Sequence, residues 1–577
     1  MVYTPETVTV FPLINSKDPY CLRCCPVYIK KRMFAYSMPR PQARCFGRQI
    51  VYWIQLGCCN RVEDNFGLQH ALSVSLTLRM PLLCLVFLPQ ELEDLVNQGR
   101  QAQSISNLMY LPLLKCLRVR LSQLNIPTLG FYIDQRDYPS LLAQLVRKHH
   151  IHMVFTNEGY SQNKQIKAIG RAITCPLFAL DSDYILPPRY IDVNLAATDH
   201  ITKIKSCINE NNLNLQTLSA SKIEADPSIQ KSLFLCNLQQ KVIYINPIIS
   251  SRWKKVEWAL LNNWSTSSYN KDFLTDRNFL AEEHCCGLID KFKTHLQETT
   301  EISTEFLSGD ILFAKVLSHI RAGTLSASRL ALEAQSWGSG RDAVIEYLCQ
   351  RERRVFVAFR KLIDAIQRNE TKNPNLKHVS REQNLEKRQQ KETQESGSPR
   401  NNISQHNNAA NFFCSEVASS MPCPDWSVFL PEHAIVELTK NDTESNRPLV
   451  HLPGDIENGE TSDVFFNSLQ CCLSSTGFLP MIALSYWFQR IVVFSSNSSQ
   501  GIFLAVTLIQ EYVPGSSHSS VDIVYEIIQE ALGHFDDTEN HPILGRIKLI
   551  TLKETREKMK LENEENFSKF LIENSPA

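Results

Sequence analysis

Short β-rich runs alternate with amphipathic stretches between residues 49 and 190, and this alternation constrains the fold more than any other feature of the chain. Strand–helix alternation with short connections is typical of a parallel sheet that carries helices on both faces. The predicted strands are Ile50–Gln55, Leu83–Leu88, Thr128–Ile133, His152–Phe155 and Pro176–Leu180, and the predicted helices lie near 65–79, 106–123, 138–149 and 161–172.

Acidic residues follow two of these predicted strands. Asp134 follows one strand and Asp181 follows another. Parallel sheets of this kind hold ligands at the carboxyl ends of their strands, so both residues are candidates for a ligand-facing edge. The sequence contains no GxGxxG or GKS/GKT element. This disfavours an NAD-type dehydrogenase and a P-loop ATPase.

The length and charge of the chain limit the number of domains and the kinds of partner that can be expected. At 577 residues the chain is too long for one ordinary domain, so two or three are expected. The 60 basic and 60 acidic residues give a formal net charge of zero. Dedicated nucleic-acid binders are usually basic, so global charge gives no support for DNA binding. A local basic groove remains compatible with zero net charge.

Cysteine usage indicates the redox environment. The chain has 18 cysteines, including the adjacent pairs at 58–59, 285–286 and 471–472. The chain is long and shows no secretory signal, so we expect reduced thiols and an intracellular protein, nuclear or cytoplasmic. Only Cys21 and Cys24 have CxxC spacing, without a second pair at zinc-ribbon distance. Packing or tail thiols are favoured over a metal site there, and we expect no metal.

Residues 464–489 carry no charge, which raises the question of a membrane span. Asn467, Gln470 and Pro480 interrupt the apolar run, which does not fill the roughly 20 positions that a span needs. A buried helical core explains the stretch better, and we expect no membrane association.

The same stretch carries a family resemblance. Residues 465–494 read FFNSLQCCLSSTGFLPMIALSYWFQRIVVF. This block resembles, without a gap, the segment that class II DNA photolyases of the photolyase/cryptochrome family place beside their flavin. The matching residues are Asn467, Gln470, Thr476, Gly477, Tyr486 and Trp487. The departures are Phe466 and Phe494 in place of two tryptophans, Pro480 in place of a histidine and Leu484 in place of an arginine.

Further motifs resemble the same family in the same order. They are RVEDN at 61–65 after Tyr52-Trp53, LDSDYILP at 180–187, LSHIRAGTLSASR at 317–329, AVIEYLCQRERRVF at 343–356 and PILGRIKLI at 542–550. Read alone, RVEDN is a helix cap and RERR is a solvated helix face. Together the motifs imply an α/β N-terminal domain with a parallel Rossmann-like sheet, followed by an all-α domain of the FAD-binding type.

The predicted domain organisation combines this resemblance with composition. Residues 368–424 are rich in Gln, Asn, Lys, Glu and Ser, and cannot bury enough apolar surface to order themselves. The predicted parts are an N-terminal tail (1–48), the α/β domain (49–190), an interdomain linker (191–249), the helical domain (250–367 and 425–560), a disordered insertion (368–424) and a C-terminal tail (561–577). The charged stretch Lys553–Lys569 is expected to be a solvated helix.

The resemblance implies bound FAD and light-driven repair of pyrimidine dimers, but the residues that this chemistry uses are changed. Ile509 takes the place of the Asn beside the flavin N5, and an isoleucine side chain makes no hydrogen bond. Leu484 removes a cation, and Gly515–Asp522 lacks the acidic pattern that anchors the flavin. Phe466 and Phe494 interrupt the tryptophan relay. The degenerate pocket positions are therefore Gly323, Ser326, Leu484 and Ile509, of which Gly323 and Ser326 keep the family residue.

Trp487 and Glu352 are the vestigial catalytic candidates, and no catalytic residue is assigned. The lesion-contacting Glu of the family falls on Arg353 in ungapped register, with Glu352 one position early. Two hypotheses remain open. The first is a catalytically degenerate photolyase homologue, without FAD, that is retained as a binding or scaffold protein. The alternative is an active deoxyribodipyrimidine photo-lyase or blue-light flavoprotein that binds FAD.

The partners follow from the same reasoning. We expect at most weak, salt-sensitive DNA binding without preference for dimer-containing DNA. Segment 368–424 is either a partner-binding segment or a tolerated loop. The absence of an anchoring aromatic residue before Phe412 favours a tolerated loop.

Overall fold

A computed structural model describes most of the two predicted domains. The described residues are 27–37, 47–55, 59–90, 105–158, 163–187, 197–209, 254–255, 282–299, 301–372, 426–442, 447, 449–513, 516–538 and 540–573. The Cys21–Cys24 motif and all of the predicted insertion beyond Lys372 lie outside these ranges.

The first domain is a seven-stranded sheet in the order β1-β6-β5-β2-β3-β4-β7. Its five central strands pair in parallel: β2 (Gln49–Ile54), β3 (Leu82–Leu88), β4 (Thr128–Tyr132), β5 (Ile151–Asn157) and β6 (Leu177–Leu180). Every residue of β2, β3 and β5 is buried, as expected for strands that helices cover on both faces. All five predicted strands are confirmed, within two residues at each end.

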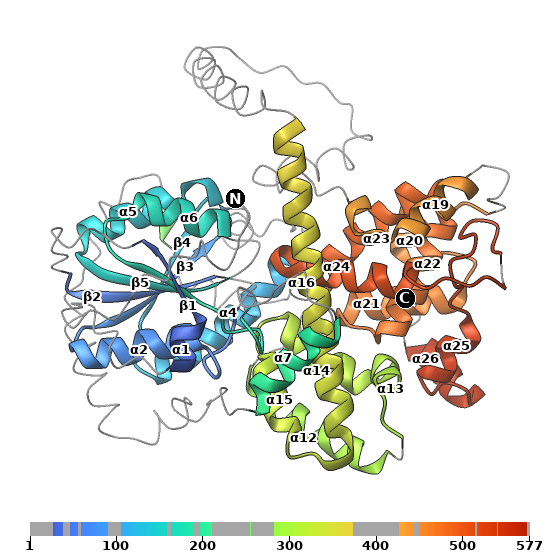
Figure 1. Cartoon of the computed structure of the whole chain (residues 1–577), viewed down its shortest axis with the longest axis horizontal. Helices are drawn as coiled ribbons and strands as arrows, with labels where there is room; N and C mark the ends of the chain where they lie inside the picture. Colours follow the sequence, from blue (N-terminus) through green and yellow to red (C-terminus); the bar gives the residue numbers. More distant parts are fainter. Residues whose placement is uncertain are drawn as a thin grey trace.

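Helices cover both faces of the sheet. One face packs α2 (Phe66–Leu78) and α4 (Ile105–Gln123), and the other packs α5 (Tyr138–Lys148) and α6 (Asn163–Ala172) (Figure 1). Neighbouring residues of β2 show the alternation, because Tyr52 belongs to the core on the first face and Trp53 to the core on the second. The predicted α/β domain class is therefore confirmed.

Both edges of the sheet correct the sequence analysis. Within the predicted tail, α1 (Val27–Arg32) leads into β1 (Met33–Ser37), which pairs antiparallel with β6. At the other edge, β7 (Lys254–Lys255) pairs antiparallel with β4. The predicted linker contains α7 (Ala197–Asn209), which packs on α16. These edge elements are short or mixed in composition, so their sequences show no apolar periodicity that would predict them.

The second part of the chain is helical in its described residues, apart from two isolated β-bridges at 535–547. Its helices are α12 (Glu282–Glu298), α13 (Thr304–Gly309), α14 (Ile311–Arg321), α15 (Ala327–Ala334), α16 (Arg341–Lys372), α19 (Glu432–Asn441), α20 (Pro453–Asn458), α21 (Val464–Thr476), α22 (Met481–Phe494), α23 (Ser498–Tyr512), α24 (Ser516–Leu532), α25 (Leu552–Lys558) and α26 (Glu564–Glu573). The long α16 runs through the middle of the molecule (Figure 1). The predicted order, an α/β domain followed by an all-α domain, is confirmed.

The uncharged stretch forms the centre of this helical core. Helix α21 ends at Gly477, whose φ of 79° is left-handed, and Pro480 begins α22. Twelve residues of α22 are buried. No single helix among the described residues is long and apolar enough for a membrane span, and the apolar pair of α21 and α22 bends by 117° at the break between them.

The predicted C-terminal tail also departs from expectation. Helix α26 packs on α21 through ring contacts of Phe567 and Phe570 with Phe465, at centroid distances of 5.7 and 5.9 Å. The exposed charges of this stretch concealed the two aromatic residues that dock it. Residues 564–571 are therefore part of the helical domain.

Candidate functional site

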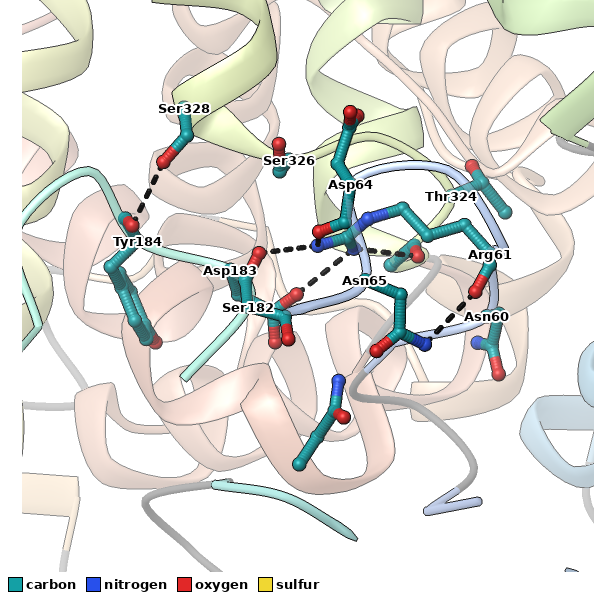
Figure 2. A network of polar contacts seen from close by, with 12 residues as sticks. Asn60, Arg61, Asp64, Asn65, Ser182, Asp183, Tyr184, Thr324, Ser326 and Ser328 are labelled. Atoms are coloured by element: carbon teal, nitrogen blue, oxygen red, sulfur yellow. Dashed lines mark hydrogen bonds and ion pairs between the residues drawn. The ribbon is translucent and has the colours of Figure 1, made fainter. Parts of the chain in front are cut away.

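Two of the predicted pocket positions lie at the joint between the two domains. The turn after α14 places Gly323 at a φ of 73°, and its carbonyl oxygen accepts from the backbone N–H of Asn60 at 2.8 Å. Ser326 caps α15, because its hydroxyl oxygen accepts from the backbone N–H of Arg329 at 2.9 Å. Gly323 therefore contacts the loop of the α/β domain that leads into RVEDN, and Ser326 follows three residues later in the chain, near Asp64 of that motif (Figure 2).

Arg61 fastens this joint. Its guanidinium is fully buried and donates to Asp183 Oδ1 at 3.0 Å, to the Gly323 carbonyl at 2.9 Å and to the Ser182 carbonyl (Figure 2). Burial raises the pKa of Asp183 to about 6, against the opposing effect of Arg61. The RVEDN and LDSDYILP motifs, predicted from different parts of the chain, thus meet each other and the Gly323 turn.

The acidic residues predicted at the ligand-facing edge already have partners. Asp181 pairs with Arg32 at 3.0 Å, and both side chains are buried. Arg32 also donates to the carbonyls of Tyr184 and Ile185, each at 2.8 Å. Asp134 caps a short turn and pairs with the exposed Arg136 at 2.6 Å. Each of these carboxylates is therefore engaged in an ion pair within the protein.

Glu352 is not exposed for lesion contact. Its side chain is fully buried and accepts from the backbone N–H groups of Ile185 at 2.6 Å and Leu186 at 3.4 Å, which belong to the other domain. Glu282 makes the equivalent contact, accepting from Val62 N at 2.9 Å and Glu63 N at 2.6 Å. Burial raises the pKa of Glu352 to about 8 and that of Glu282 to about 7. These two carboxyl groups clamp the domains together.

The remaining pocket positions lie elsewhere, inside the apolar core of the helical domain. Leu484 and Ile509 are 1% and 0% exposed, and share one cluster of buried apolar side chains with Trp487. Phe466 and Phe494, the substitutes for two tryptophans, meet edge to face at 5.6 Å. Leu484, Ile509 and Trp487 thus belong to the apolar core of the helical domain, whereas Gly323 and Ser326 lie in and just after the turn at the joint between the domains.

These residues do not fit the polar edge of a flavin. Neither Leu484 nor Ile509 supplies a hydrogen-bond donor or acceptor, and both are packed among apolar side chains. The indole nitrogen of Trp487 is already engaged by Gln470 Oε1 at 2.8 Å. The side chains of 515–522, where an acidic anchor was sought, fall outside the described part of the chain.

The sequence analysis missed a buried charged cluster between α14, α16 and α24. Glu526 lies between two guanidinium groups, with Oε2 3.6 Å from Arg321 Nη2 and Oε1 3.5 Å from Arg354 Nη2. Burial alone would raise the pKa of Glu526, but Arg354 and Arg321 hold it below its usual value. Tyr347 and Arg354 lie seven residues apart, two turns of α16, and so share a face. That helical period was the signal for this cluster, because it places Arg354 of RERR, which read alone is a solvated helix face, on the same side of α16 as the buried Tyr347.

The described residues do not cluster as metal ligands. No group of three or more His, Cys, Asp or Glu side chains there is arranged to hold a metal ion. Nine cysteines whose side chains the structure describes are free thiols.

Comparisons with known proteins give structural neighbours only. No protein-family model matches the chain, and no curated protein matches it. A class III photolyase from the bacterium Agrobacterium tumefaciens is 11% identical with a TM-score of 0.44, over 92% of this chain and 96% of that chain. An archaeal photolyase from Sulfolobus tokodaii, solved with two FAD molecules, is 14% identical with a TM-score of 0.42, over 91% and 90%. The class II assignment stays a prediction from the motifs.

Proposed function

We propose that this chain is a divergent member of the photolyase/cryptochrome superfamily, similar in its motifs to class II, that acts as a binding or scaffold protein. In this proposal it carries no stoichiometric FAD and does not repair pyrimidine dimers in light. The main observation in support of this proposal is that Leu484 and Ile509 lie inside a continuous apolar cluster.

The polar edge of a flavin would lose hydrogen bonds against these side chains. A buried polar cofactor group that faces Ile509 instead of a hydrogen-bonding side chain costs about 1–3 kcal/mol. Each 1.4 kcal/mol is about a tenfold loss of affinity, so a few such losses weaken binding by orders of magnitude. The interdomain role of Glu352 also removes it from the surface that a flipped base would reach.

The test is a spectrum and a repair assay on one preparation. Full-length protein purified in the dark is examined for a flavin absorbance band, for flavin by mass analysis, and for loss of dimers under blue light. We expect neither flavin nor repair. A flavin band together with dimer loss would establish the alternative, an active photo-lyase.

The DNA part of the proposal is tested separately. Competition titration compares ultraviolet-damaged and undamaged duplex at two salt concentrations. We expect weak binding that salt abolishes, with no preference for damage. Strong selectivity for damaged duplex would contradict the proposal whatever the flavin content.

A further inference from the structure

One surface of the helical domain exposes an unusual number of aliphatic side chains. Leu449, Val450, Leu452 and Val464 are 46%, 49%, 70% and 62% exposed. The side chains of His451 and Ser462 meet at 3.5 Å, so the segments that carry these residues lie side by side. We call residues 449–464 the 449–464 surface. Scattered exposed aliphatic residues need no explanation, but a group of them at one place marks an interaction site.

Residues 449–464 themselves carry four carboxylates and no lysine or arginine. The sequence has no lysine or arginine between Arg447 and Arg490, whereas the 449–464 surface carries Asp455, Glu457, Glu460 and Asp463. Arg490 compensates Asp463 at 3.2 Å. Glu457 and Glu460 are exposed. Burial, together with the neighbouring Glu457, raises the pKa of Glu511 to about 7. The negative charge at this end of the surface is therefore in excess.

A partner that binds this surface needs aliphatic groups to cover the exposed aliphatic side chains and cations to pair with the carboxylates. We propose that the 449–464 surface binds a basic segment of another protein, in which lysine or arginine residues alternate with aliphatic ones. Burial of Leu452 and Val464 would supply affinity, and contacts of the cations with Glu457 and Glu460 would supply orientation and association rate. The same carboxylates repel the phosphates of nucleic acids and of anionic lipids, so these are disfavoured as occupants.

This inference gives the proposed binding role a class of partner, but it depends only on the surface. Flavin content and dimer repair do not enter it. The two proposals can therefore fail separately in the same preparation.

The experiment uses the full chain and a fluorescent 16-residue peptide in which leucine and lysine alternate. A matched peptide replaces every lysine by glutamate and keeps every leucine. Fluorescence anisotropy should detect binding of the lysine peptide, which weakens as salt rises, and no binding of the glutamate peptide. Equal binding of both peptides would overturn the proposal, because apolar contact alone would explain it.

Two double variants locate the binding. Leu452→Ser with Val464→Ser should weaken binding about tenfold or more, and Glu457→Gln with Glu460→Gln should weaken it and flatten its salt dependence. Serine at 452 is a good helix N-cap and all four side chains are at the surface, so the fold should hold. The control is Ile435→Ser with Val436→Ser, which removes exposed aliphatic residues from α19.

The binding measurements on these variants can support or refute the site. Loss of binding in both double variants with unchanged thermal unfolding, and full binding in the α19 control, would support the site. Unchanged binding in the variants, or equal loss in the control, would refute it. Stronger binding of an oligonucleotide or of anionic vesicles than of the lysine peptide would also refute it.

Discussion

The indole nitrogen of Trp487 donates a hydrogen bond of 2.8 Å to Gln470 Oε1, and both side chains are buried. The amide nitrogen of Gln470 in turn donates to the Glu457 carbonyl at 2.8 Å, which ties α21 and α22 to α20. Trp487, which matches a tryptophan of the class II photolyase pattern, therefore has a structural task. Its presence needs no electron transfer to explain it.

Trp487→Phe should destabilise the protein by about 2–4 kcal/mol, because it removes apolar volume and leaves Gln470 Oε1 unpaired. Urea unfolding followed by circular dichroism measures the loss. Gln470→Leu should destabilise the Trp487→Phe variant by less than it destabilises the wild-type protein, because the hydrogen bond is already absent from that variant. Strict additivity of the two substitutions would argue against the hydrogen bond.

Arg61→Met should cost about 3–5 kcal/mol, because it leaves the Asp183 carboxylate and two buried carbonyls without their donor. Arg136→Met is the matched control, since its pair with Asp134 is exposed and worth at most about 1 kcal/mol. Urea midpoints measure both. Limited proteolysis should also cut the Arg61 variant faster between the domains, and equal stability of the two variants would refute the fastening role.

The interdomain carboxyl groups predict a pH dependence of stability. The pKa values of Glu352 and Glu282 rise to about 8 and about 7 in the folded protein, above the usual 4.5, because both groups are buried. Their folded forms hold protons that the unfolded chain has released. The stability they contribute is thus fully present below about pH 4.5, and is lost as pH rises to about 7 for Glu282 and about 8 for Glu352.

Glu352→Gln and Glu282→Gln should each reduce the fall in unfolding free energy between pH 5 and pH 8. The reduction should approach about 1.4 kcal/mol per pH unit within the window of each group. Urea unfolding across this pH range gives the difference from wild type. Glu298→Gln, an exposed position of α12, is the control and should leave the profile unchanged. Wild-type slopes in the two interdomain variants would contradict the pKa values.

Ile509→Asn introduces the residue that the class II photolyase pattern has at this position, but we expect it not to produce flavin binding. It buries an amide in an apolar cluster, so a loss of about 2–4 kcal/mol is expected, with no absorbance band after incubation with FAD. Thr507→Asn, on the partly exposed side of the same helix, should change stability by less than about 0.5 kcal/mol. A flavin band from Ile509→Asn alone would show that the pocket is still built.

The central strands were predictable because helices cover them on both faces, which forces continuous apolar runs in β2, β3 and β5. The edge strand β1 was not, since only Met33 of its five residues is fully buried. Helix α26 was missed for a similar reason, because two aromatic residues dock it within a charged stretch.

The motifs predicted the positions of important residues more successfully than they predicted the roles of those residues. Gly323, Ser326 and Glu352 were singled out as pocket or catalytic positions, yet their hydrogen bonds join or border the two domains. A sequence match records the residue and its spacing but not the partner across a long-range contact. The pairing of Arg61 with Asp183 spans 122 positions and has no local signature.

The edge strand β7 has a consequence for the order in which the protein is made. Lys254 and Lys255 pair with Tyr132 and Phe131, two of the five residues of β4, and are translated long after β6. Until residue 255 emerges, the outer edge of β4 presents unpaired backbone groups to other nascent chains. Translation from β4 to residue 255 therefore sets how long Phe131 and Tyr132 at the end of β4 lack their partner strand.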